Sequence, residues 1–138
     1  MLLRPRKLPG ECKMGLTHVA VKLRNRDSSD EFNASFLVDT GATDSMVPAN
    51  ELNRIGIKPT GKKIYELANG ELEEYDIGYA ELSFMGETMT SRVIFGPDNS
   101  EPILGVIALE SHGLVVDPTT QTLKRLRGLP LKQIALAK

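Results

Sequence analysis

Turn-forming residues interrupt this 138-residue chain at intervals of ~8–12 residues, which leaves room only for short elements between them. Apolar and polar residues alternate within most of these intervals, as they do in half-buried strands. A helical spacing of apolar residues is confined to two short segments, 48–55 and 106–111. The pattern predicts an all-β fold, a small barrel or sandwich with one or two short helices.

Several of the turns are expected to join neighbouring strands as hairpins. The strongest signal is Asn69-Gly70, because Asn-Gly between two strand-like segments favours a tight turn. Met85-Gly86 predicts another hairpin, and so do the polar run 25–30 and the segment 117–120. The strands expected beside these turns are 16–23, 32–38, 64–67, 71–77, 79–84, 88–95, 114–116 and 122–126.

Charge and cysteine content narrow the possible functions. The formal net charge is -1, so the chain as a whole has no electrostatic preference for nucleic acid or for an anionic membrane. Its one cysteine, Cys12, excludes an intrachain disulfide framework, and one cysteine with two histidines does not favour a structural zinc site. No secretory signal peptide or membrane span is predicted, so a cytoplasmic location is expected.

The composition along the chain suggests one domain with two flanking segments. Residues 1–14 form a basic, proline-containing lead-in, and residues 15–127 hold the strand-like pattern. Residues 128–138 form a short basic tail. Acidic residues gather instead around the Asn69-Gly70 hairpin; they are Glu66, Glu71, Glu73, Glu74 and Asp76. A solvated hairpin face explains them, but if they line a cleft they predict a preference for basic substrates.

The segment Asp39-Thr40-Gly41 carries the clearest chemical signal. An apolar strand leads directly into Asp39, which tends to bury its carboxylate, and Thr40 offers a hydroxyl for a short-range hydrogen bond. Gly41 has no side chain, so a second backbone or a ligand can approach the carboxylate closely. A simple Asx turn at the end of a strand is the alternative interpretation.

With its neighbours, this segment resembles the retropepsin-like aspartic proteases, single-domain relatives of pepsin that include the retroviral proteases. The resemblance rests on the apolar strand and Asp-Thr-Gly-Ala of residues 36–42, on a flap hairpin at 68–70, and on Ile-Leu-Gly at 103–105 before the short helix 106–111. It covers roughly residues 16–126. It implies a small closed barrel-like fold with a flap hairpin.

The resemblance also implies a mechanism and its partners. Asp39 of each subunit in a two-fold homodimer would supply one of two carboxylates that share a proton and activate a water, so no cofactor or metal is expected. Thr40 would brace the pair and Gly41 would admit backbone and substrate, which makes Asp39, Thr40 and Gly41 the catalytic set. An extended peptide substrate would be bound by Ala42, Ala68, Asn69, Gly70, Ile103 and Leu104.

Two other functions remain open at this point. The fold could serve as a non-catalytic dimerisation or peptide-binding module, although a pure scaffold has no need of a carboxylate at Asp39. Nucleic-acid binding through the basic tail is the weakest hypothesis, because the net charge is -1 and no aromatic residue lies near the tail.

Overall fold

Strands make up most of the chain that the computed structural model describes, which is residues 17–117 and 119–129. The predicted lead-in 1–14 and residues 130–138 of the predicted tail lie outside the described residues. The elements in chain order are β1 (Thr17–Arg24), β2 (Glu31–Val38), β3 (Ser45–Pro48), α1 (Ala49–Arg54), β4 (Gly61–Glu66), β5 (Leu72–Phe84), β6 (Glu87–Gly96), β7 (Ile103–Leu104), α2 (Val106–Ser111), β8 (Leu114–Asp117) and β9 (Thr122–Arg125).

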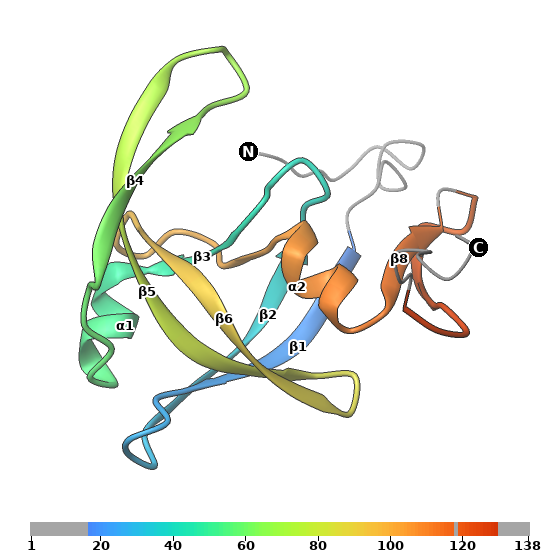
Figure 1. Ribbon diagram of the computed structural model, residues 1–138, viewed down its shortest axis with the longest axis horizontal. Coiled ribbons are helices and arrows are strands. Elements are labelled where there is room, and N and C mark those ends of the chain that lie inside the picture. The colour runs from blue at the N-terminus through green and yellow to red at the C-terminus, as the bar shows by residue number, and fades with distance from the viewer. Residues whose placement is uncertain (1–16, 118, 130–138) are drawn as a thin grey trace, which may run out of the picture.

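The main sheet has the strand order β1-β2-β7-β3-β6-β5-β4 (Figure 1). Strand β1 also pairs with β5 through Lys22, Leu23 and Arg24, so the pairings return to the strand from which they began and leave β4 outside the ring. Strands β8 and β9 form a separate two-stranded sheet. The all-β prediction is confirmed, including its two short helices.

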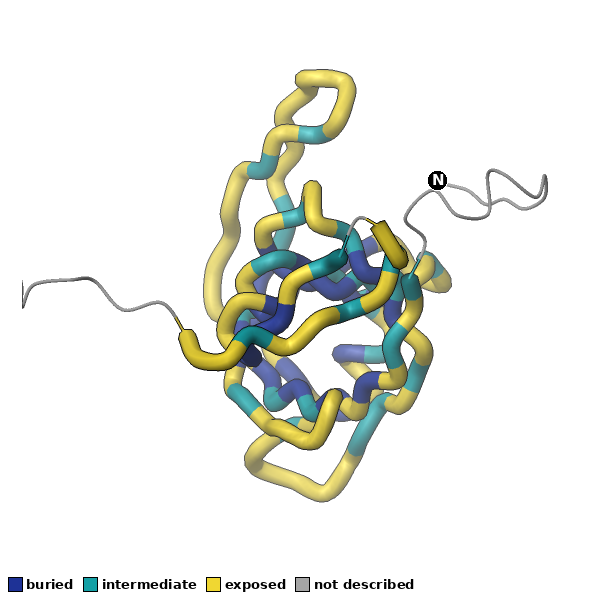
Figure 2. The backbone as a smooth tube through the Cα atoms, turned by 90° about the vertical axis from the view of Figure 1, so that its right-hand side faces the viewer, coloured by how far each residue is buried: buried dark blue, intermediate teal, exposed yellow. Residues whose placement is uncertain are grey.

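The core fills the inside of this ring, where the dark blue backbone of Figure 2 gathers. Alternation places Val21 and Leu23 of β1 inside while Lys22 between them is exposed. On β2, Phe36 and Val38 are buried, and the partly buried residues before them pack against the same cluster. The predicted inward face of residues 32–38 is therefore confirmed.

The predicted break between two strands at Gly78 is wrong, because β5 runs without interruption from Leu72 to Phe84. Gly78 instead marks a close approach of other residues. A Cβ at this position would lie 3.0 Å from the Lys58 carbonyl oxygen and 3.1 Å from Cε1 of Phe95. The absence of a side chain at Gly78 thus lets β5 pack closely against the residues that follow α1.

Strands β4 and β5 form the hairpin that the Asn69-Gly70 signal predicts. Their antiparallel register pairs Gly61 with Ile77 and Glu66 with Leu72. Gly70 has a φ of +88°, which suits glycine at the turn. The hairpin extends well beyond the rest of the sheet in Figure 1 and is largely exposed in Figure 2. The hairpin therefore projects from the ring of strands.

The two short helices lie close to their predicted positions. Helix α1 begins one residue after the expected start, because Pro48 ends a short strand, β3, that the sequence did not predict. Gly56 follows α1 with a φ of +83°. Helix α2 spans Val106–Ser111 as predicted. The β8–β9 hairpin around residues 117–120 is also confirmed.

Candidate functional site

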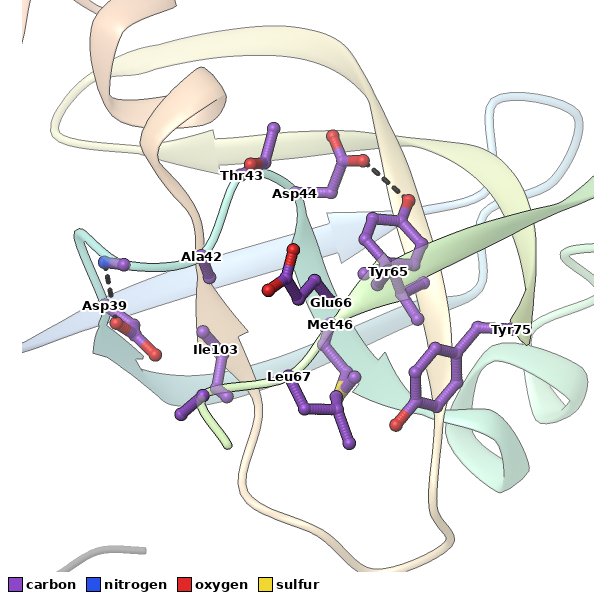
Figure 3. A pocket seen from close by; sticks show the side chains of 13 residues that line it. Asp39, Ala42, Thr43, Asp44, Met46, Tyr65, Glu66, Leu67, Tyr75 and Ile103 are labelled. Atoms are coloured by element: carbon purple, nitrogen blue, oxygen red, sulfur yellow. Dashed lines mark hydrogen bonds between the residues drawn. The ribbon is translucent and has the colours of Figure 1, made fainter. Parts of the chain in front are cut away.

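Asp39 lies directly after β2, where the strand leaves the sheet (Figure 3). Its side chain is half-buried, while Thr40 and Gly41 are exposed. The Gly41 N–H donates a hydrogen bond of 2.9 Å to Oδ1 of Asp39. A Cβ on Gly41 would lie 3.3 Å from the same oxygen, so glycine keeps this backbone close to the carboxylate. The carboxylate is thus oriented by its own loop.

Strand β7 holds both ends of the loop that carries Asp39. Ile103 pairs in parallel with Leu37 of β2 and in antiparallel with Met46 of β3, so β7 lies between the strands that enter and leave the loop. The Asp39 N–H continues this ladder by donating to the Leu104 carbonyl at 3.0 Å. The backbone of Asp39 is therefore fixed by the sheet.

Helix α2 fixes the second half of the loop. The first N–H groups of a helix have no partner within it. In α2 the N–H of Val106 donates to the Ala42 carbonyl at 2.8 Å, and that of Ile107 donates to the Thr43 carbonyl at 3.1 Å. The Gly105 N–H donates to Oγ of the buried Ser45 at 3.0 Å. The carbonyl groups of the loop therefore accept hydrogen bonds from the first N–H groups of the helix.

An open cleft of about 590 Å³ lies beside Asp39, between this loop and the β4–β5 hairpin. The residues that line it are Asp39, Gly41, Ala42, Thr43, Asp44, Met46, Tyr65, Glu66, Leu67, Ala68, Tyr75, Ile94 and Ile103. Figure 3 shows that they come from the loop, the hairpin and the sheet floor. The cleft therefore joins segments that are far apart in the sequence.

The structure brings together part of the predicted site. Asp39, Gly41, Ala42, Ala68 and Ile103 all line the cleft. The remaining predicted residues lie nearby but do not line it; they are Thr40, Asn69, Gly70 and Leu104. The first three are exposed, on the loop and at the hairpin tip, whereas the Leu104 side chain is fully buried in the core.

A buried carboxylate, Asp44, forms a polar cluster that the sequence analysis missed. Asp44 is only 5% exposed, and its Oδ2 accepts hydrogen bonds from the Tyr65 hydroxyl at 2.7 Å and from Nε of Arg92 at 3.1 Å. Burial, and then the hydrogen bond to Asp44, raise the pKa of Tyr65 above its ordinary value. The one available signal was an acidic residue two positions before the apolar pair Met46-Val47.

Neither histidine lines this cleft. His18 contacts Glu101 at the surface, with 2.9 Å between Nε2 and Oε2. His112 is buried and stacks on Phe84, with 3.9 Å between the ring centroids. Within residues 17–117 and 119–129, no group of three or more His, Cys, Asp or Glu side chains is arranged to hold a metal ion. The helices of this part of the chain are also too short to cross a membrane.

One family model matches this chain, and solved structures share its fold. A family model described as "gag-polyprotein putative aspartyl protease" matches residues 29–111. The EIAV protease, solved in complex with the inhibitor HBY-793, aligns with a TM-score of 0.55 and 18% identity, over 70% of this chain and 86% of that one. A retropepsin-like aspartic protease from Rickettsia conorii aligns with a TM-score of 0.46 and 20% identity, over 73% and 88% of the two chains. No curated protein sequence matches significantly.

Replacement of Gly105 by alanine tests the packing of the loop against α2. A Cβ there would lie 2.6 Å from the Asp44 carbonyl carbon and 2.7 Å from its oxygen, and this backbone is held by α2. We expect Gly105→Ala to lower the free energy of unfolding by about 2 kcal/mol or more. Gly61→Ala is the matched control, because a Cβ there meets nothing within 4 Å. Urea denaturation at one protein concentration measures both, and equal losses would contradict the packing.

Tyr65→Phe tests the hydrogen bond to Asp44 through the pH dependence of stability. The pKa of Tyr65 is raised in the folded protein above its ordinary value of 10.0. Above pH 10, the unfolded chain therefore loses the phenol proton that the folded chain keeps, and the free energy of unfolding falls as the pH rises. From about pH 9 to about pH 11, wild type should lose more stability than Tyr65→Phe. If urea denaturation showed that wild type and Tyr65→Phe lose the same free energy of unfolding over this pH range, the hydrogen bond from Tyr65 to Asp44 would be contradicted.

Proposed function

Because this chain belongs to the gag-polyprotein aspartyl protease family and has the retropepsin-like fold, we propose that it is an aspartic endopeptidase. The observation that carries the proposal is the Asp39 carboxylate, half-buried and oriented by Gly41 in the wall of an open cleft. The cleft offers apolar side chains of the sheet and is bordered by the β4–β5 hairpin. In this proposal residues 15–127 form the catalytic domain.

A second copy of the chain supplies the second carboxylate. The sequence contains one Asp-Thr-Gly segment, and the nearby carboxylate of Asp44 already accepts hydrogen bonds from Tyr65 and Arg92. Thr40 and Gly41 are exposed in the single chain, so this part of the loop is open to a partner. A two-fold axis beside Thr40 would bring Asp39 against the partner subunit's Asp39, since such an interface places equivalent residues together.

The two carboxylates share one proton, because like charges held so close do not both ionise. The ionised carboxylate removes a proton from a water, and the water oxygen attacks the carbon of the peptide carbonyl. The protonated carboxyl donates a hydrogen bond to the carbonyl oxygen as negative charge develops there. When the C–N bond breaks, the protonated carboxyl passes its proton to the leaving nitrogen, the proton taken from water stays on the pair, and the products are a carboxyl group and an amine.

The other site residues support this reaction from their positions. Thr40 braces the two loops across the two-fold axis. The β4–β5 hairpin acts as the flap, with Ala68, Asn69 and Gly70 at its tip, and closes over the substrate to exclude water. Ala42 and Ile103 line the cleft against the extended peptide. Leu104 acts through its carbonyl, which fixes the Asp39 backbone, while its side chain packs in the core.

Asp39→Asn tests the proposal directly. The change is nearly isosteric and removes the ionisable oxygen, so cleavage of unfolded casein should fall by a factor of about a thousand or more across the acidic and neutral pH range. A statine-type transition-state analogue should inhibit the wild type. Asp27→Asn is the matched control, because Asp27 lies in the exposed turn between β1 and β2, and it should keep full activity. Cleavage by Asp39→Asn at the wild-type rate would refute the proposal. A wild-type protein that forms a folded dimer but cleaves nothing would favour the non-catalytic binding module.

A further inference from the structure

The charged side chains that line the cleft are all acidic; they are Asp39, Asp44 and Glu66. Asp44 is balanced by the guanidinium of Arg92 and by the Tyr65 hydroxyl. Asp39 is assigned to the shared pair of the proposed reaction. Glu66 remains, and no ion pair or hydrogen bond joins its carboxylate to the described part of the chain. The cleft therefore carries one negative charge with no assigned role.

Glu66 differs in position from the other acidic residues of the hairpin. It is the last residue of β4 and lines the cleft, and Figure 3 shows its carboxylate among the lining side chains. Glu71, Glu73, Glu74 and Asp76 do not line it, and Asp76 accepts a hydrogen bond of 2.6 Å from Nζ of Lys62. The acidic character predicted around the hairpin therefore reaches the cleft through Glu66.

The surroundings of Glu66 suit a long cationic side chain. Leu67, Met46, Ile94 and Ile103 contribute apolar surface to the same cleft. Lysine and arginine bury their aliphatic stems along such surface and keep the charged end near a polar partner. An acidic substrate side chain would instead meet the charges of Glu66 and Asp39, and a cleft of one sign concentrates ligands of the opposite sign.

We propose that Glu66 is a specificity-determining residue, and that it selects peptides that place a lysine or arginine side chain in this cleft. The inference rests on the proposed function and adds the class of substrate to it. Glu66 is exposed and therefore accessible to a substrate side chain. A hydrogen bond between a carboxylate and an ammonium or guanidinium group changes affinity by about tenfold.

The test uses peptides built on a sequence that the wild type cleaves in casein. Each position near the scissile bond carries, in turn, lysine, glutamine or glutamate, and kcat/KM is measured for every peptide. At one position or more, wild type should favour lysine over glutamine, and Glu66→Gln should reduce this ratio about tenfold. Glu66→Lys should favour glutamate there. Glu74→Gln is the matched control on the same hairpin and should leave the lysine preference unchanged.

The outcomes separate this inference from the proposed function. Cleavage with a lysine preference that is equal in wild type and Glu66→Gln overturns the role of Glu66 but keeps the protease. If wild type cleaves neither casein nor any peptide, the protease proposal fails, and binding of labelled peptides that share one casein sequence and differ only in one lysine, glutamine or glutamate is measured by fluorescence anisotropy. Tighter binding of the lysine peptide by wild type than by Glu66→Gln then supports the selectivity of the cleft, and equal binding overturns it.

Discussion

The backbone hydrogen bonds between the Asp39 loop and residues 104–107 are the constraint on which the site depends. Strand β7 lies between the strands that enter and leave the loop, and α2 donates its first N–H groups to the loop carbonyls. Gly105 makes this approach possible, since any Cβ there would collide with the Asp44 backbone. Because the ladder, the loop and the helix satisfy one another, the orientation of Asp39 is set by main-chain geometry.

The polar cluster at Asp44 extends this order to the hairpin. Its carboxylate accepts hydrogen bonds from Tyr65, near the end of β4, and from Arg92 of β6, so one buried group ties the loop to the hairpin and to the sheet. A buried carboxylate without such partners would be costly. The same pairing neutralises Asp44 and leaves Glu66 as the exposed charge across from Asp39. In our proposal, the charge that a substrate side chain meets is therefore that of Glu66.

The fold was largely predictable from the sequence, because most strands show alternation and end at clear turn signals such as Asn69-Gly70. Three features were not predictable. Strands β3 and β7 have four and two residues, too few to show a period. The predicted break at Gly78 does not occur, because glycine serves close contacts with Lys58 and Phe95 that depend on tertiary packing. The position of Asp39 in the cleft agrees with the prediction, which rested on the specific segment Asp39-Thr40-Gly41. Asp44, Tyr65 and Arg92 meet only through folding, so local sequence could not join them.

Mixing wild type with Asp39→Asn tests most directly whether one active site needs Asp39 from both chains. The two proteins are unfolded together and refolded in varied proportions at constant total concentration, and casein cleavage is measured for each mixture. If the site forms between two copies, activity falls with the square of the wild-type fraction, because mixed dimers hold one carboxylate of the pair. A linear fall would contradict the account, since it would mean that each chain cleaves on its own.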